Sequence, residues 1–263
     1  MKPASTKTIT FVVAVNNREI FENNFLISPC VREPNDHEVL VQEAFDSAAK
    51  AYNEAIERSM NELIVFCHQD IFLPKSWLSD LARALDYLEV YNSNWGVLGC
   101  SGITRDRRHW RYVYSSGLGV SGEPLARPEP VQTLDEMVLI LRKSSGLRFD
   151  PRLPHFHLYG TDICLRAASM GMTSYAISAF CIHNTHQSLI LPEEFYHCCQ
   201  YVRRVWRNSL PIQTTCIRIT RSNIPIYLRR LQEFCLRYVR RKEVGGARVP
   251  NVQRVFEENA PRP

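Results

Sequence analysis

The sequence predicts an α/β protein in which the strands of a largely parallel sheet alternate with helices. Short apolar, β-branched segments alternate with segments of helical apolar spacing over about 180 residues. Several of the apolar segments stop abruptly at polar residues, as strands do when their carboxyl ends border a ligand site. The chain is 45% hydrophobic and 22% charged, which is typical of a soluble globular protein with a sizeable core.

The N-terminal part of the chain contains three predicted strands and two predicted helices. The β-branched segment 8–15 predicts a first buried strand, and the half-polar segment 37–43 predicts a second. Apolar residues recur at helical spacing in 47–60, after Asp46 or Ser47 as the N-cap. The apolar run 63–67 predicts the next strand, and 76–91 predicts the next helix.

The same alternation continues toward the C-terminus. Residues 95–103 predict a strand that contains glycines, and the basic segment TRDRRHWR after it predicts a loop. Gly, Pro and Ser are frequent in 115–130, which indicates a further loop. Segments 131–144 and 173–186 have strand-like composition, whereas 159–171 is typical of a helix that ends at a glycine.

The last part of the chain is basic and helical. Residues 187–263 contain 14 Lys and Arg against 6 Asp and Glu, so their net charge is +8, whereas the other 186 residues sum to −3. Segments 195–206 and 224–242 each combine an apolar stripe with arginines, and the tail from 244 is expected to be loose. Such helices can lie on an anionic membrane or pack on the α/β domain; narrow, Cys-containing stripes favour packing.

The cysteines and the apolar segments indicate a cytoplasmic protein. There are nine cysteines, an odd number with no CxxC pair, and several lie in apolar runs, which predicts reduced thiols. The apolar run in residues 1–17 is too short for a signal peptide, and no segment approaches the roughly 18 apolar residues of a membrane span.

The segment HQD at 68–70 follows the apolar strand 63–67 and is the first candidate site. His68 and Asp70 point to the same side if the strand continues, so both could bind one cation. Carboxylate oxygens suit Mg²⁺ or Mn²⁺, and an imidazole favours Mn²⁺. The alternative is that Asp70 caps a turn before Pro74 and His68 is a surface residue.

Other polar residues have two interpretations each. Asp162 opens a predicted helix, either as an N-cap or as a general base for an incoming hydroxyl. His183 follows an apolar strand and is a candidate third metal ligand, with His186 as the competing choice. Asp135 and Glu136 begin a strand-like segment, where either could bind a sugar hydroxyl or be solvated.

The order of these segments is more informative than any one of them. The chain has a strand ending in Asn, an AYNEAI helix, a strand ending in HQD, VQTLDE with RKSSGLRFD, YGTDICLRA, and a strand ending in His. This order resembles the family-2 glycosyltransferases of the GT-A fold, and most of all the glycosyltransferase-like branch in which the DxD motif is a His-x-Asp. The resemblance covers roughly residues 8–190.

The resemblance implies a fold, a domain organisation and a donor site. The fold would be a GT-A-like, Rossmann-like mixed sheet flanked by helices in residues 1–190, and 191–263 would be a basic α-helical extension with a loose tail. Asp70 and His68 would match the DxD motif and hold Mn²⁺ or Mg²⁺ on the donor diphosphate, with His183 as the late histidine ligand. Asn16 and Asn53 would match nucleotide-contacting positions.

The resemblance also implies an acceptor side and a catalytic base. Asp162 would match the base of inverting members, and Asp135 an acidic residue near the sugar and the acceptor, with Glu136 beside it. Arg166, one helical turn after Asp162, could pair with that carboxylate or with a phosphate. Trp110, or Tyr112 in the same segment, could stack on a sugar ring.

The sequence departs from the family pattern in the region that should bind the nucleobase. The family usually has a strand that ends in an acidic pair, but between Asn17 and Tyr52 only Glu43 and Asp46 are available, and both fit poorly. Tyr52 also replaces the arginine expected before the helix asparagine, and His68 replaces the first acid of DxD. The identity of the nucleotide therefore stays open.

We therefore predict a glycosyltransferase of carbohydrate biosynthesis. It would move a sugar from a nucleotide-diphosphate-sugar donor to an acceptor hydroxyl with inversion of the anomeric centre, and with Mn²⁺ or Mg²⁺ as cofactor. The acceptor would be a glycan, a lipid-linked molecule or a small molecule. The protein would be cytoplasmic, with possible peripheral contact to the inner face of the membrane through the C-terminal helices. Two alternatives are a non-catalytic nucleotide-sugar-binding relative, and a basic protein that binds a membrane surface or, less favoured, nucleic acid.

Overall fold

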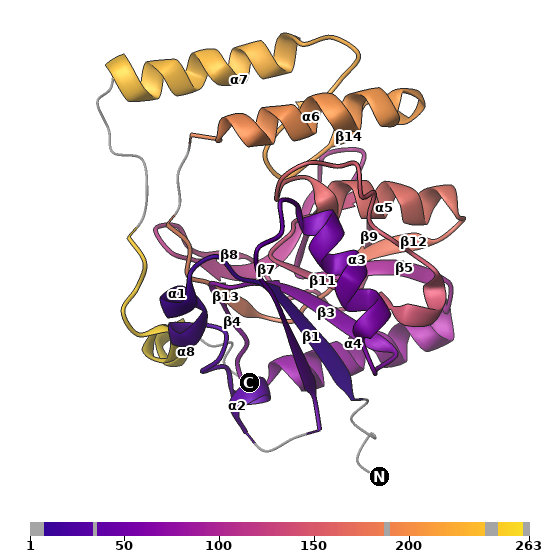
Figure 1. Ribbon diagram of the computed structural model, residues 1–263, viewed down its shortest axis with the longest axis vertical. Helices are drawn as coiled ribbons and strands as arrows, with labels where there is room; N and C mark the ends of the chain where they lie inside the picture. Colours follow the sequence, from indigo (N-terminus) through magenta and orange to yellow (C-terminus); the bar gives the residue numbers. More distant parts are fainter. Residues whose placement is uncertain (1–7, 34–35, 187–189, 240–246, 260–263) are drawn as a thin grey trace.

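A seven-stranded mixed sheet lies at the centre of the protein, with helices on both faces (Figure 1). The structure is a computed structural model, and it describes residues 8–33, 36–186, 190–239 and 247–259. The large sheet has the strand order β2-β1-β3-β11-β5-β12-β9. Its strands are β1 (Ile9–Ala14), β2 (Glu38–Gln42), β3 (Leu63–His68), β5 (Trp95–Gly99), β9 (Glu129–Val131), β11 (Val138–Arg142) and β12 (Thr173–Ala176).

A second, smaller sheet has the order β10-β6-β7-β13-β4, and β8 pairs with β7 outside this path. Its strands are β4 (Ile71–Phe72), β6 (Ser101–Ile103), β7 (His109–Ser115), β8 (Gly119–Gly122), β10 (Thr133–Leu134) and β13 (Cys181–His183). A separate two-stranded sheet consists of β14 (Ile212–Gln213) and β15 (Arg218–Ile219).

The described helices cover the sheets and extend beyond them. They are α1 (Arg18–Asn23), α2 (Pro29–Arg32), α3 (Ala48–Arg58), α4 (Trp77–Tyr91), α5 (Tyr159–Ser169), α6 (Glu193–Val205), α7 (Ile224–Phe234) and α8 (Val252–Asn259). A π-helical turn, Cys235–Val239, continues α7, and two 3-10 turns lie at Lys143–Ser145 and Arg207–Ser209. One apolar core cluster joins the sheet to α3, α5 and α6, and another joins it to α1 and α4.

Three neighbouring parallel strands fix the position of the candidate site. β1 lies between β2 and β3, and Ala14 is in register with Gln42 on one side and with His68 on the other. Because parallel strands end at the same edge, the polar residues that follow all three meet there. The strands are specified by apolar residues buried on both faces, as in the five-residue run Leu63–Cys67 of β3.

Helix α3 shows how local sequence produces this packing. The side chain of Ser47 accepts a hydrogen bond from the backbone N–H of Lys50 and so caps the first turn. Tyr52 and Ile56, four residues apart, are fully buried on one face of the helix. The Tyr52 ring lies 4.8 Å from that of Phe66 on β3, which fixes the helix against the sheet.

Most predicted elements are present, but some predicted loops are strands. The segment 115–130 contains β8 and the start of β9, and the basic segment TRDRRHWR leads directly into β7. The arginines interrupt the apolar pattern at the start of β7, although this strand lies inside the small sheet and pairs with β6, β8 and β13. The sheet is also mixed, since β11 runs antiparallel to both β3 and β5.

The C-terminal residues divide into parts with different packing. Helix α6 buries Phe195, Tyr196 and Val202 in the same core cluster as α3 and α5. The domain boundary at residue 190 stays a prediction. Contrary to the expected loose tail, residues 252–259 form helix α8. Its Val252 is 1% exposed in a cluster that also contains Phe72 and Phe180.

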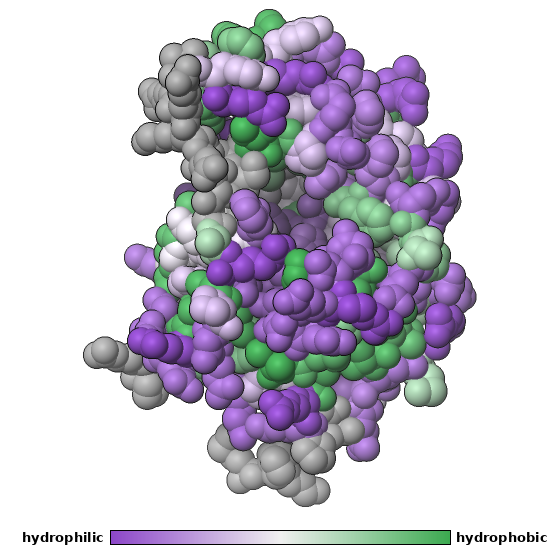
Figure 2. Space-filling view, turned by 60° about the vertical axis from the view of Figure 1, so that its left-hand side comes forward, coloured by the Kyte–Doolittle hydropathy of each residue, from purple (hydrophilic) through white to green (hydrophobic). Residues whose placement is uncertain are grey.

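Helix α7 forms the outermost layer at the top of the protein (Figure 1). Large apolar side chains of this helix are exposed, and the space-filling view shows apolar surface at the same end of the molecule (Figure 2). The prediction that its apolar stripe packs on the domain is therefore wrong. None of the described helices is long and apolar enough to span a membrane.

Candidate active site

His68, Asp70 and His183 lie together at the edge where β1, β2 and β3 end. One ligand atom from each side chain lies within 4.8 Å of the others. β3 ends at His68, the chain turns at Gln69–Asp70, and β4 then pairs antiparallel with β13, which brings His183 opposite Ile71. The strand does not continue through Asp70, so the turn rather than strand alternation brings the two side chains together.

The charges in this cluster stabilise one another. His183 Nε2 lies 3.4 Å from Asp70 Oδ1. Burial lowers the pKa of His183, but the charge and hydrogen bond of Asp70 outweigh burial and raise it. Burial raises the pKa of Asp70, yet the two histidines and Arg248 lower it well below its usual range. Burial and the neighbouring His183 lower the pKa of His68, which favours its neutral, metal-binding form.

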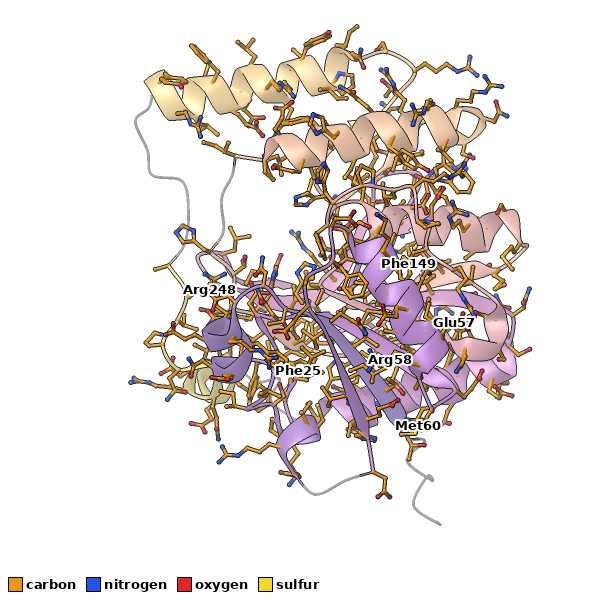
Figure 3. The ribbon with its side chains drawn as sticks, viewed as in Figure 1. Phe25, Glu57, Arg58, Met60, Phe149 and Arg248 are labelled. Atoms are coloured by element: carbon orange, nitrogen blue, oxygen red, sulfur yellow. The ribbon has the colours of Figure 1, made fainter. Side chains whose placement is uncertain are left out.

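Arg248 reaches the cluster from the C-terminal segment. Its guanidinium lies 3.6 Å from Asp70 Oδ2, and its Nε donates to the backbone carbonyl of Asn184. The Asn184 side chain in turn exchanges hydrogen bonds with the backbone of Val249, and so fixes this segment beside β13. Figure 3 shows Arg248 on the segment that leads to α8, on the same side of the sheet as α1.

A pocket of about 420 Å³ opens next to the cluster. Its lining comes from the ends of β1, β2 and β3, from α3 and from the segment before α5: Ala14, Val15, Asn16, Gln42, Ala44, Phe45, Tyr52, His68, Gln69, Asp70, Phe156 and Tyr159. Gln69, the middle residue of HQD, accepts from the backbone of Asn16 and Asn17 and donates to the Asn16 side chain. It therefore ties the ends of β1 and β3 into one wall.

Gln42 is a polar residue of this pocket whose side chain is not fully satisfied. It is 3% exposed, and its Nε2 is buried without a hydrogen-bond partner among the described residues. A buried donor without an acceptor is costly, so such an atom in a pocket wall indicates a ligand acceptor. The neighbouring Ala44 has a φ of +62°, which is strained for a residue with a side chain.

Tyr159 connects the cluster of His68, Asp70 and His183 to the acidic pair at 135–136. Its hydroxyl lies 2.9 Å from His68 Nε2 and donates to the backbone carbonyl of Glu136 at 3.2 Å. Asp135 accepts from the backbone of Met137 and from the Thr215 hydroxyl, so both of its oxygens are engaged. Asp135 therefore has a structural role in holding the β14–β15 hairpin.

Glu136 is placed differently from its neighbour. It is half-buried beside the first turn of α5, where a Cβ built on Gly160 would lie 3.2 Å from the Glu136 Cγ. Burial and the charge of Asp135 raise the pKa of Glu136, although the backbone N–H groups of Leu158 and Gly160 partly oppose this. No ion pair of Glu136 is present within the described part of the chain.

The prediction that Asp162 is the catalytic base is not supported by the structure. Asp162 is fully buried, and its two oxygens accept from Trp206 Nε1 and Arg166 Nε, each at 2.7 Å. A carboxylate with no exposed surface and both oxygens occupied has no route to an acceptor hydroxyl. The residue instead anchors the start of α5 to the end of α6.

We predict that Asp162→Ala lowers the free energy of unfolding by about 3–5 kcal/mol, because Arg166 loses a buried partner. Urea denaturation measures this loss. Asp86→Ala, an exposed carboxylate on α4, should change stability by less than about 0.5 kcal/mol. A stable Asp162→Ala protein that binds donor but has lost transfer would restore the catalytic role.

Arg166 is also occupied and is not available to a sugar or a phosphate. Besides Asp162, it pairs with Asp150, which accepts from the Tyr201 hydroxyl as well. Burial raises the pKa of Asp150, but the hydrogen bonds from Arg152 and Tyr201 outweigh this and lower it to about 2. The network joins α5, α6 and the segment before α5, so it is structural.

Three further predicted contact residues lie outside the pocket lining. The Asn53 side chain exchanges two hydrogen bonds with the backbone of Phe149, so it ties α3 to that segment rather than to a nucleotide. Trp110 lies on β7, half-buried, with the Arg108 guanidinium over its ring. Tyr112 is buried against Phe180 and cannot stack on a sugar.

Sequence reasoning missed several residues of the site. Gln42 is the last residue of β2, and it carries an amide where the family pattern predicts an acidic pair. Phe156 lies just before α5 and Tyr159 is the first residue of that helix, and neither was predicted as a site residue. Arg248 lies in a tail that was expected to be loose. Of the two candidate histidines, His183 joins the cluster, whereas His186 is exposed and outside it.

The comparisons with known proteins agree with this architecture. A model of the Glycosyltransferase like family matches residues 10–200. The chain belongs to this glycosyltransferase-like family. The match covers most of the chain and confirms the predicted resemblance to a glycosyltransferase-like family and the predicted class, glycosyltransferase. The His-x-Asp branch stays a prediction.

Individual relatives of this glycosyltransferase-like protein are distant. A Fuscovulum blasticum protein, "ATP synthase subunits region ORF 6", is 27% identical over 169 residues, which cover 61% of this chain and 66%, slightly under two thirds, of that protein. GalNAc-T7, solved with UDP, GalNAc and Mn²⁺, has a TM-score of 0.51 at 9% identity, covering 98% of this chain and 57% of that one. TarS 1-349 of S. aureus, solved with UDP-GlcNAc, has a TM-score of 0.49 at 13% identity, covering 80% and 68%. The likeness to GalNAc-T7 supports the predicted GT-A fold.

Proposed function

We propose that this protein transfers a sugar from a nucleotide-diphosphate-sugar to an acceptor hydroxyl, with inversion and with a divalent metal ion. The observation that carries the proposal is the cluster of His68, Asp70 and His183, of which His68 and Asp70 line a pocket of about 420 Å³. A diphosphate needs a cation, and a nucleoside needs a concave pocket beside it. The candidate cation ligands and the pocket both lie at the strand edge where α/β sheets bind ligands.

The three side chains fit a divalent metal ion. Two imidazoles and one carboxylate favour Mn²⁺ over Mg²⁺, because Mg²⁺ prefers oxygen ligands. When bound, the ion would neutralise charge on the diphosphate as the bond to the sugar breaks. Arg248, which contacts Asp70, is positioned to add a second positive group for the same phosphates.

The rest of the pocket fits a nucleoside. Gln42 offers an unpaired, buried amide N–H that a carbonyl or ring nitrogen of a base would satisfy. Phe45 and Phe156 contribute aromatic surface to the same lining, and base–aromatic stacking tolerates any base. Asn16, held by Gln69, lies at the end of β1 as predicted for a nucleotide contact. An amide in place of an acidic pair leaves the base undetermined.

We assign the general base to Glu136 in place of Asp162. Glu136 is half-buried, the Tyr159 hydroxyl links its backbone carbonyl to His68, and its carboxylate has no ion pair among the described residues. In the proposed step, the acceptor oxygen bonds to the anomeric carbon and its proton passes to Glu136. The bond from that carbon to the diphosphate breaks, and the electron pair leaves with the nucleoside diphosphate.

We further propose that the protein acts in the cytoplasm, at the inner face of the membrane. A lipid-linked acceptor would present its hydroxyl there, close to a peripheral enzyme. A glycan or a small molecule would be used in solution instead.

A donor panel tests the proposed function. Nucleoside diphosphates and their sugars are titrated calorimetrically with Mn²⁺, with Mg²⁺ and with EDTA, and slow release of sugar to water is followed by chromatography. We expect one base to bind with Mn²⁺, more weakly with Mg²⁺, and at least about tenfold more weakly with EDTA. Binding without any sugar release or transfer would favour the non-catalytic relative, and no binding by folded protein would contradict both functions.

A further inference from the structure

Helix α7 carries a continuous apolar face that the rest of the described protein does not cover. Ile224, Tyr227, Leu228, Leu231 and Phe234 are each 56–66% exposed, and Tyr238 in the following π turn is 61% exposed. Their spacing of three and four residues places them on one side of the helix. An apolar patch of this size on a soluble protein marks a contact surface rather than ordinary surface variation.

The inward side of the helix combines one buried apolar residue, Ile226 at 8% exposure, with polar side chains that attach the helix to α6. Glu233 is 7% exposed, accepts from the Tyr196 hydroxyl and pairs with Arg229 on its own helix. Arg230 pairs with Glu193 and lies over the Tyr196 ring. Most of the large apolar side chains of α7 are therefore exposed, while Ile226 and the charged contacts hold the helix to the protein. The helix lies at the top of the molecule (Figure 1).

The charge around this face selects the occupant. Within residues 190–239 there are eight arginines and three glutamates, and two of those glutamates are already paired with Arg229 and Arg230. Arg221 and Arg237, at the two ends of the helix, are exposed and have no ion pair within the described residues. Two copies meeting through α7 would bring like charges together, whereas an anionic surface would neutralise them.

We propose that α7 is a membrane-docking helix that lies flat on an anionic lipid bilayer. Its leucines and Phe234 would enter the boundary of the acyl chains, Tyr227 and Tyr238 would lie at headgroup level, and the arginines would meet lipid phosphates. The helix would lie on the membrane and not cross it. This surface is separate from the pocket and does not depend on the transferase chemistry.

Vesicle flotation of the full chain tests the proposal. Wild type is mixed with phosphatidylcholine vesicles that contain 30% phosphatidylglycerol or none, and each sample is repeated at high salt. We expect flotation with the anionic vesicles, at least tenfold weaker binding to the neutral ones, and weakening by salt. Equal binding to both vesicle types, or no binding to either, would overturn the proposal.

A matched pair of double variants assigns the binding to α7. Leu228→Ser with Leu231→Ser removes apolar surface from the face, and Met60→Ser with Val90→Ser removes exposed apolar surface elsewhere. All four side chains are at least 59% exposed, so both variants should keep the wild-type melting temperature. We expect at least a tenfold loss of anionic vesicle binding only in the α7 variant. A wild-type dimer that this variant converts to a monomer, without vesicle binding by either, would identify a second copy as the occupant instead.

Discussion

Replacing Asp70 with asparagine is expected to remove metal-dependent donor binding. Asp70 is the single carboxylate of the cluster, and its charge draws in the cation that the two histidines alone would hold weakly. Changes to groups around a metal ligand already cost 10–100-fold in metal affinity, so losing a ligand itself should cost about 100-fold or more. Titration of Mn²⁺ alone, followed by electron paramagnetic resonance, measures this independently of any activity.

The asparagine variant needs a control for folding and for general charge loss. Asp86→Asn, on the exposed side of α4, changes the net charge equally and should bind Mn²⁺ and donor like wild type. Because Asp70 also pairs with His183 and Arg248, the melting temperature of both variants is compared. Unchanged Mn²⁺ affinity in a folded Asp70→Asn protein would show that the cluster is an internal ion pair and no metal site.

The sequence predicted the strand edge well because the signal there is local. An apolar run that ends in HQD identifies both a buried strand and the residues at its end. The parallel register of β1 with β3 brings the end of β1 to the same edge. The three predicted metal ligands meet because the turn after β3 holds Asp70 beside His68 and the antiparallel pairing of β4 with β13 brings in His183, which is 113 residues from Asp70. The family order of segments supplied the pairing that spacing alone could not.

The errors arose where one residue type serves two purposes. An aspartate at the start of α5 is equally expected of a base and of a structural anchor, and only burial and the contacts of Trp206 and Arg166 distinguish them. Trp206 lies 44 residues after Asp162, so no local sequence pattern predicts their hydrogen bond. In the same way, the stripe on α7 is visible in sequence, but whether it faces the protein or the solvent depends on the buried Glu233 contacts with α6.

Replacing Glu136 with glutamine is expected to lower kcat by about 10²–10⁴-fold, the usual contribution of a general base. The amide keeps the size of the side chain beside Gly160, so the first turn of α5 should be undisturbed. Affinity for donor and Mn²⁺ should stay within about twofold of wild type, because Glu136 is neither a cluster residue nor part of the pocket lining. Rapid-quench assays with a saturating donor measure the chemical step.

Two comparisons decide whether that loss reflects proton transfer. Glu136→Asp retains a carboxylate but withdraws it by one methylene, and it should keep more activity than Glu136→Gln if a base is needed at that point. Asp135→Asn, the adjacent carboxylate engaged by Met137 and Thr215, should change stability more than kcat. Full activity in Glu136→Gln would exclude its carboxylate as the base, and with Asp162 buried it would leave activation of the acceptor to the cluster itself. A joint loss of donor affinity and rate would instead place Glu136 in donor binding. The role assigned here therefore requires a fall in kcat with donor affinity intact.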